Sequence, residues 1–480
     1  MRDSLWLCLG LPALPIEALG LGDSPQACVL TTPGREPRIR IGNRAAYALG
    51  IAPGMRAGAA QALGDIKVYT PPRGSAERTA LEALAAWCGQ FTSVVSLAPP
   101  DGLLLEIGQS LTLFGGVAKL VERVRAGVAD LGYQPLLAIA PTPLAAIFFV
   151  RARQAICVTD PRQLHALLSR LPLAVLGVDV RIAEALAGLG LREVGECLRL
   201  PRDGLARRFG PALVRLLDRA SGRQPDPRLP FEPPARFERL LDLPHEAEDI
   251  QALQFAARRL LLELAGFLRA RGAGARELDW RLVHRDRRET PFKLTLLTPS
   301  RDPEHLGQLL RSRLERLVLP EPVRALRLIV EDLCPLAGVT LALLPGGKEQ
   351  SQAQSLAFLE RLRARLGEDT VRGLRLLPDH RPEAAWCFCS PGQASSSPGM
   401  RSRPLWLLDP PQALDVAEGQ PRFRGPLGLM GRGERIESGW WDGQPMGRDY
   451  FVARNPLGGR YWVFREVEGE RRWFVHGICD

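Results

Sequence analysis

The stretch that decides the fold is Pro99-Pro100-Asp101-Gly102-Leu103-Leu104-Leu105-Glu106, taken together with Leu5-Trp6-Leu7-Cys8-Leu9 near the start of the chain. Both contain short apolar runs that are typical of buried β-strands. Enzymes that transfer phosphoryl groups with two metal ions aim carboxylates from adjacent strands at one point, because Mg²⁺ prefers hard oxygen ligands. Asp101 is such a carboxylate. Cys8 and Gly102 cannot act in this way, because a neutral thiol is a poor Mg²⁺ ligand and glycine has no side chain.

The residues around these strands predict a β-α-β-β-α-β order of elements, which is typical of a ferredoxin-like unit. We expect strands at 5–9, 103–107, 111–114 and 135–140, helices at 75–91 and 117–131, and an insertion at about 20–73. The same order recurs further along the chain, with strands at 237–243, 276–284, 292–297 and 323–331 and helices at 248–271 and 302–319.

Other parts of the chain have a different character. Residues 168–228 predict a short all-helical unit, and the periodicity of residues 354–366 predicts an amphipathic helix after a Gly-Gly pair. Residues 393–403 are rich in Ser and Pro. Period-2 patterns near the end of the chain predict a β-rich module, which with its approach carries six of the nine tryptophans, namely Trp386, Trp406, Trp440, Trp441, Trp462 and Trp473.

Composition narrows the choice of partners. The chain has 480 residues, of which 46% are apolar, and a formal net charge of +10, with arginine far commoner than lysine. Arginine suits bidentate phosphate contacts, but a codon bias toward arginine explains the same ratio, so charge permits nucleic-acid binding without establishing it. Transmembrane and signal segments are not expected, and nine scattered cysteines favour reduced thiols in a cytoplasmic protein.

At the two strands quoted first, the chain resembles the Y-family, or translesion, DNA polymerases. That family carries an Asp where Cys8 stands, and an Asp-Glu pair where Asp101 and Gly102 stand. Tyr47 lies in a stretch that aligns with the triphosphate-binding finger motif, and Ile147 stands at the position of a phosphate-binding Lys. The resemblance therefore implies a degenerate, non-catalytic site without a metal ion or another cofactor.

The resemblance also implies an α+β multidomain fold with the family's right-hand layout. We expect a ferredoxin-like palm at 1–30 and 74–167, small fingers at 31–73, a helical thumb at 168–228, and a ferredoxin-like little finger at 236–345. A linker with an amphipathic helix at 346–403 and a Trp-rich C-terminal module at 404–480 complete the chain.

With Asp449-Tyr450-Phe451 and Trp473-Phe474-Val475-His476-Gly477 near its end, the whole chain resembles catalytically inactive members of this family that belong to the bacterial mutasome. That likeness implies an adaptor in DNA-damage-induced (SOS) translesion synthesis, associated with the nucleoid. Its implied partners are primer-template DNA, the sliding clamp, a RecA-like accessory protein and an error-prone C-family DNA polymerase. Two other hypotheses stay open: a weakly active polymerase that rebuilds its site from Asp101, Glu106 and Glu17, and a DNA-damage protein without a clamp contact.

Two binding sites are expected from the same resemblance. A clamp-binding peptide is expected at Gln354, Ser355, Leu356, Ala357 and Phe358, although the same residues also suit the first turn of an amphipathic helix. DNA-phosphate contacts are expected from Arg285, Arg287, Arg288 and Lys293 beside a hairpin, although Asp286 and Glu289 make a solvated tip equally plausible.

Two further patterns have competing explanations. Residues 176–190 resemble a helix-hairpin-helix DNA clamp in which Asp179 replaces a glycine, but a plain helical packing unit fits as well. The tryptophans of the tail could stack on single-stranded bases, yet aromatic residues at strand spacing more often form a core. We therefore expect them mainly in the core of a small module that docks other proteins.

Overall fold

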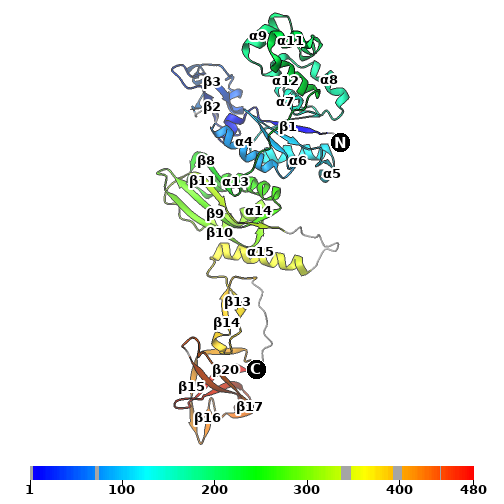
Figure 1. Cartoon of the computed structure of the whole chain (residues 1–480). Coiled ribbons are helices and arrows are strands. Elements are labelled where there is room, and N and C mark those ends of the chain that lie inside the picture. The colour runs from blue at the N-terminus through cyan, green and yellow to red at the C-terminus, as the bar shows by residue number, and fades with distance from the viewer. Residues whose placement is uncertain (1–3, 71–74, 337–347, 393–402, 444, 480) are drawn as a thin grey trace. The chain divides into compact units, whose positions relative to one another are not determined.

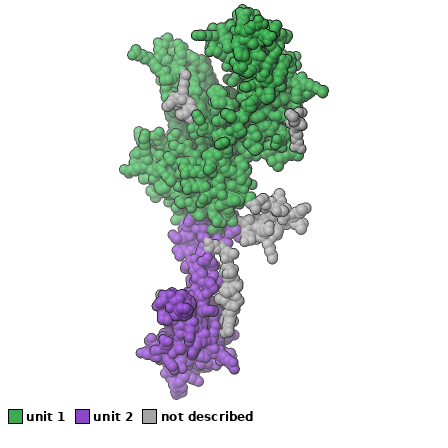
Figure 2. All heavy atoms as spheres, viewed as in Figure 1, with its two compact units in different colours: residues 1–347 green, residues 348–480 purple. Residues whose placement is uncertain are grey.

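The computed structural model describes residues 4–70, 75–336, 348–392, 403–443 and 445–479. Contacts divide the chain into two compact units, residues 1–347 and 348–480, which are described separately (Figure 2). Unit 1 contains both predicted ferredoxin-like segments and the helices between them (Figure 1). Unit 2 contains the amphipathic helix and the β-rich module.

The first sheet of unit 1 contains the two strands on which the fold was predicted. Its strands are β1 (Trp6–Gly10), β5 (Val95–Ala98), β6 (Gly102–Glu106) and β7 (Leu136–Ala140), paired in the order β5-β6-β1-β7. All neighbours are antiparallel, which is the ferredoxin-like arrangement.

One strand of this sheet was predicted in the wrong place. Residues 111–114 form a helical turn, α5 (Leu111–Phe114), and the missing strand is β5. Val95 pairs with Leu105, so the partner edge of β6 is already taken when the chain reaches residue 111. The turn then ends at Gly115, whose φ of 73° is the left-handed conformation that glycine adopts at helix ends.

The two faces of this sheet are covered differently. On one face, Leu7 and Leu9 pack with helices α4 (Ser75–Cys88) and α6 (Val117–Asp130). On the other face, Cys8 and Leu104 pack against α7 (Pro143–Arg151) and the helices that follow it. This alternation is the period-2 pattern of a strand buried on both sides.

The all-helical prediction for the next segment is confirmed. Its elements are α8 (Pro161–Ser169), η1 (Leu173–Leu176), α9 (Val180–Gly188), α10 (Val194–Arg199), α11 (Arg202–Phe209) and α12 (Pro211–Ser221). Their apolar faces share one core with Cys8 and Leu104 of the first sheet, so these helices complete the burial of that face.

The insertion after β1 forms a small sheet of its own. After α1 (Leu14–Glu17) come β2 (Ala27–Thr31), β3 (Ile39–Gly42) and β4 (Ile66–Tyr69), paired in the order β3-β2-β4, with the short helices α2 (Arg44–Ala48) and α3 (Ala57–Gln61). A separate core that includes Val29, Ile39 and Ala60 holds it together.

The second α/β segment has the predicted order of elements but a different order of strands. Its elements are β8 (Phe237–Ala247), α13 (Ile250–Ala270), β9 (Ala273–His284), β10 (Glu289–Ser300), α14 (Pro303–Leu314), β11 (Val323–Val330) and the short β12 (Leu333–Pro335). The main strands pair in the order β10-β9-β11-β8, so β11 lies inside this sheet, whereas its counterpart β7 forms an edge of the first. Element order alone does not specify which strand of a hairpin becomes the edge.

Unit 2 begins with α15 (Lys348–Leu366) and a two-stranded sheet of β13 (Gly373–Leu376) and β14 (Trp386–Cys389), with the 3-10 turn η2 (Pro382–Ala384) between them. A six-stranded antiparallel sheet follows, in the order β16-β15-β20-β19-β18-β17. Its strands are β15 (Trp406–Ala417), β16 (Gln420–Arg422), β17 (Gly428–Ser438), β18 (Met446–Arg454), β19 (Arg460–Glu466) and β20 (Trp473–Cys479).

The expectation that the tail tryptophans mainly form a core is wrong. Trp462 is buried and stacks on Tyr450 with ring centroids 4.0 Å apart. Trp386, Trp406, Trp440 and Trp441 are exposed. They lie at strand ends and in a loop, where the period-2 rule no longer decides which side chains turn inward.

The predicted α+β multidomain fold class is therefore observed. Unit 1 contains two mixed α/β segments, and unit 2 contains the β-rich C-terminal module. Within the residues that the structure describes, no helix combines the length and apolar character needed to cross a bilayer.

Helices α4 and α13 approach closely because two glycines leave room for one tryptophan. A Cβ atom on Gly266 of α13 would lie 2.1 Å from Cδ1 of Trp87, and one on Gly127 of α6 would lie 2.5 Å from the same indole. Trp87 is buried, so its ring cannot move into solvent to make space.

We expect Gly266→Ala to lower the free energy of unfolding by about 1–3 kcal/mol, because overpacking forces the indole or the helix to shift. Gly307→Ala in α14 is the matched control, since its Cβ would meet only Leu261, at 3.8 Å. The control should be neutral or stabilising by up to about 1 kcal/mol, from helix propensity. Urea unfolding midpoints measure both variants, and equal shifts would contradict the close packing.

Candidate functional site

The two strands quoted first in the sequence analysis, β1 and β6, lie side by side. Cys8 of β1 pairs with Leu104 of β6, and Gly10 pairs with Gly102. The Cys8 side chain is buried in the core shared with α7. Burial, reinforced by the nearby Asp101 carboxylate, raises the pKa of the Cys8 thiol to about 12. The thiol is therefore protonated at neutral pH and offers no charge to a cation.

Asp101 is the one carboxylate at the three positions. It lies in the turn before β6, on the rim of a cavity of about 680 Å³ that Pro12, Pro15 and Arg40 also line. Desolvation raises its pKa, while Arg151 and Arg153 act in the opposite direction. A metal ion held by a single carboxylate would be weakly bound.

Gly102 has little room for the acid that the family carries there. A Cβ atom at this position would lie 3.2 Å from the carbonyl oxygen of Ala98 and 3.3 Å from that of Leu9. Among the described residues, no group of three or more His, Cys, Asp or Glu side chains is arranged to hold a metal ion.

Both acids that could replace the missing ligands are engaged elsewhere. Glu106 lies opposite Trp6, and its Oε1 accepts hydrogen bonds from the backbone N–H groups of Leu5 (3.3 Å) and Gly108 (3.1 Å). Glu17 is buried at the end of α1, where its Oε1 accepts a hydrogen bond of 3.0 Å from the N–H of Gln134. Neither carboxylate is free to turn toward Cys8.

The nucleotide-binding positions have structural partners instead. The Tyr47 hydroxyl accepts a hydrogen bond of 3.2 Å from the backbone N–H of Gly42, and Ile147 packs against the core of the helical segment. A residue that sequence reasoning missed is Arg151 of α7, which donates a hydrogen bond of 3.0 Å to the carbonyl oxygen of Val175. Its charge acts on both Cys8 and Asp101, and no local motif marks it.

In residues 176–190, which resemble a helix-hairpin-helix DNA clamp, an aspartate occupies the place where an anion would bind. Asp179 is the N-cap of α9, and its carboxylate accepts a hydrogen bond of 2.9 Å from the backbone N–H of Arg181. A phosphate would need the same N–H groups at the positive end of the helix. The carboxylate both occupies them and repels the phosphate.

The four residues predicted to contact DNA lie in and beside the β9–β10 hairpin. Arg285 is 3.6 Å from Glu246, Arg288 is 2.9 Å from Asp286, and Lys293 is 2.6 Å from Glu277. Arg287, with a φ of 68°, is the member of this group for which no ion pair is found in the described part of the chain. Their DNA contact stays a prediction.

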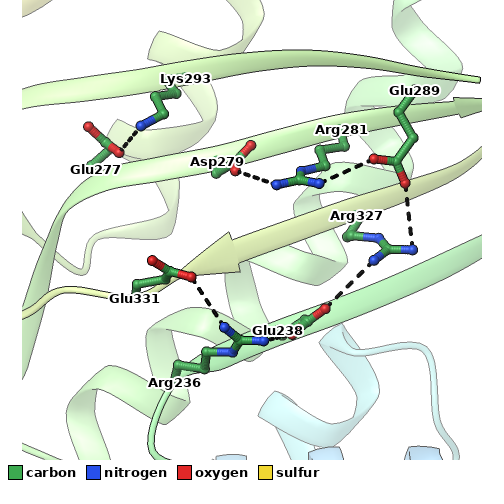
Figure 3. Close-up of polar contacts among 9 residues, drawn as sticks. All are labelled: Arg236, Glu238, Glu277, Asp279, Arg281, Glu289, Lys293, Arg327 and Glu331. Carbon is green, nitrogen blue, oxygen red and sulfur yellow. Dashed lines mark hydrogen bonds and ion pairs between the residues drawn. The ribbon is translucent and has the colours of Figure 1, made fainter.

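Beyond this hairpin, ion pairs cross the whole sheet of the second α/β segment (Figure 3). Arg281 contacts Asp279 and Glu289, and Arg327 of β11 contacts Glu238 on the neighbouring β8 and Glu289 at the start of β10. Arg236 joins Glu238 to Glu331. These seven residues, with Glu277 and Lys293, form what we call the ion-pair ladder: four cations and five carboxylates.

The predicted clamp peptide lies inside a helix. All five residues belong to α15, and the description of side chains begins at Ser355. Leu356 is half-buried and faces Gly392, where a Cβ atom would come within 2.7 Å of its Cδ2. Ala357 is half-buried, and Phe358 is 53% exposed. Clamp binding through these residues stays a prediction.

Comparison with known proteins places the chain in a family. Residues 23–149 match the model of the impB/mucB/samB family, and residues 241–356 match the C-terminal domain of that family. Protein ImuB from two strains of Caulobacter vibrioides is 30% identical over 459 residues, which cover 90% of this chain and 100% of the relative. The chain belongs to the impB/mucB/samB family and is a homologue of ImuB. This confirms the predicted resemblance.

Solved structures of Y-family proteins are also similar, at lower identity. DinB from Sulfolobus solfataricus shares 15% identity at a TM-score of 0.37, covering 69% of this chain and 100% of that chain. A Y-family chimera of Dbh and Dpo4 shares 14% identity at a TM-score of 0.39, covering 68% and 99%.

Burial of Glu17 predicts a pH dependence of stability. Desolvation raises the pKa of Glu17 to about 7 from an ordinary value of 4.5. The unfolded chain therefore ionises first as pH rises, and the stabilising contribution, complete below about 4.5, is lost as pH approaches 7. We expect Glu17→Gln to remove this loss, which is on the order of 2–3 kcal/mol. Denaturant unfolding from pH 4.5 to 8 measures it.

The matched control is Glu122→Gln, which removes an exposed carboxylate from α6. It should keep the fall in stability between pH 4.5 and 7. If wild type and Glu17→Gln show the same slope, Glu17 is ionised in the folded protein and the assignment is incorrect.

Proposed function

We propose that this protein is a non-catalytic adaptor in damage-induced translesion synthesis. It binds DNA and the sliding clamp and recruits an error-prone C-family polymerase, together with a RecA-like accessory protein of the ImuA type. The observation that carries the proposal is the buried, protonated Cys8 thiol beside Asp101, at the point where the family aims its carboxylates. Homology to ImuB supports the mutasome setting.

The chemistry of primer extension explains why this arrangement argues against catalysis. Two metal ions must hold the attacking and leaving oxygens, and the protein must supply carboxylates for both. Glu106 and Glu17 are held by backbone N–H groups, and Tyr47 and Ile147 have structural partners in place of a triphosphate. Loss of even one transition-state contact typically costs about 10²–10³ in rate.

We expect no primer extension by the purified protein with either Mg²⁺ or Mn²⁺, measured on a labelled primer-template. The alternative function, a weakly active translesion polymerase, predicts extension that Asp101→Ala abolishes. Asp130→Ala, which removes an acid at the end of α6 instead, controls for general effects of losing a carboxylate. Extension that depends on Asp101 alone would overturn the adaptor proposal.

The clamp contact is supported by the exposure of Phe358 at the start of unit 2. An aromatic side chain that is 53% exposed on a helix is available to fill a pocket on a partner. We expect Phe358→Ala to weaken binding to the purified sliding clamp at least tenfold while leaving DNA affinity unchanged. Surface plasmon resonance with immobilised clamp measures the first, and fluorescence anisotropy the second.

Leu366→Ala is the control for this test, because Leu366 is 48% exposed on the same helix but lies outside the peptide. It should bind the clamp as wild type does. Equal binding by both variants would place the clamp contact elsewhere or remove it from the function.

A further inference from the structure

The charged surfaces of unit 1 differ in how their cations are compensated. In the ion-pair ladder, all four cations lie within 4 Å of a carboxylate, and five carboxylates face four cations. Exposed pairs of this kind are individually weak, at about 0–1 kcal/mol, so a ligand could break them. An approaching phosphate backbone would nevertheless meet a face with no excess positive charge.

Helices α11 and α12 instead carry exposed arginines for which no carboxylate partner is found among the described residues. Leu213, Leu217 and Ala220 form the buried face of α12, and Arg215 is exposed because it is displaced from that face by about half a turn. Arg207 and Arg208 are exposed in the last turn of α11, which packs on α12. We call Arg207, Arg208 and Arg215 the arginine surface.

Two of the acids near this surface have their carboxylates in ion pairs. Asp218 is buried and pairs with Arg202, and Asp226 pairs with Arg228. Asp203 contacts Arg207 through its backbone carbonyl oxygen, which accepts a hydrogen bond of 3.3 Å from Nε. In the described part of the chain, no carboxylate lies within ion-pair distance of these three arginines. Their charge is therefore available to a ligand.

We propose that the arginine surface, and not the sheet that carries the ion-pair ladder, is the principal contact of this protein with the phosphate backbone of DNA. Guanidinium groups suit phosphate, because their fork geometry gives two parallel hydrogen bonds to phosphate oxygens. Such contacts fix position without reading sequence. The inference rests on the DNA binding in the proposed function.

The test compares two triple variants that remove the same charge. Arg207→Ala/Arg208→Ala/Arg215→Ala changes the arginine surface, and Arg285→Ala/Arg287→Ala/Arg288→Ala changes the β9–β10 hairpin. All six side chains are exposed. The full-length protein is titrated with a duplex oligonucleotide at several salt concentrations, and the logarithm of the association constant is plotted against the logarithm of salt concentration.

We expect the arginine-surface variant to make this slope shallower by about 3, close to one unit for each lost phosphate contact, and the hairpin variant to stay within about 1 of wild type. A variant with Arg207→Lys/Arg208→Lys/Arg215→Lys should keep a slope near the wild-type value, because the charges remain. Circular-dichroism melts check that all variants are folded.

Equal slopes for the two triple variants, or a larger loss from the hairpin, would overturn the inference while wild-type DNA binding survives. An acidic protein as the true ligand of the arginine surface would give this result, because DNA binding would not need the surface. Wild-type protein without salt-dependent DNA binding would instead remove the proposed function itself. The two failures are thus distinguishable.

A second variant removes carboxylates from the ion-pair ladder and should increase the salt dependence of DNA binding. Glu277→Gln/Asp279→Asn/Glu289→Gln removes three carboxylates from the ion-pair ladder without changing side-chain size much. Lys293, Arg281 and Arg327 then lose partners and gain freedom to meet phosphate. The salt slope should become steeper by 1 to 3. An unchanged slope would mean that carboxylate pairing is not what keeps DNA from this face.

Discussion

The antiparallel pairing of β1 with β6 is the constraint on which the rest of unit 1 depends. It sets Cys8 opposite Leu104 and Gly10 opposite Gly102, and it gives the central strand two buried faces. Once Leu7 and Leu9 face α4 and α6, Cys8 must face α7 and the helices of residues 161–221. Cys8 thus lies in a hydrophobic core, where an ionised side chain would be costly.

The burial of Cys8 depends on the packing of α7 and of the helices in residues 161–221. A thiol can lie in the core because it behaves as a small apolar group, whereas an aspartate there would need partners or water. Arg151 comes from the same α7 and reaches the carbonyl oxygen of Val175, which ties α7 to η1. Tyr47, Ile147, Glu17 and Glu106 likewise make structural contacts with other parts of unit 1.

Charge is divided across unit 1 in a way that composition cannot express. A net charge of +10 describes the whole chain, yet the ion-pair ladder has five carboxylates for four cations, whereas no ion pair is found among the described residues for the arginine surface of α11 and α12. The partition follows from strand order. Because β11 lies inside the sheet, Arg327 reaches carboxylates on both sides, Glu238 and Glu289, and these compensate its positive charge.

Sequence alone determined the types of most elements, the repeated β-α-β-β-α-β order and the family, because each depends on local periodicity or on which residues stand at particular positions. It misplaced one strand at 111–114 and put exposed tryptophans in a core, because strand pairing and side-chain direction at strand ends are not local properties. Only the tertiary structure decided that Cys8 is buried, that Glu17 and Glu106 are occupied, and which arginines are free. The physical reason is that desolvation and ion pairing depend on distances between side chains far apart in the chain, and those distances are set when the sheets choose their strand order.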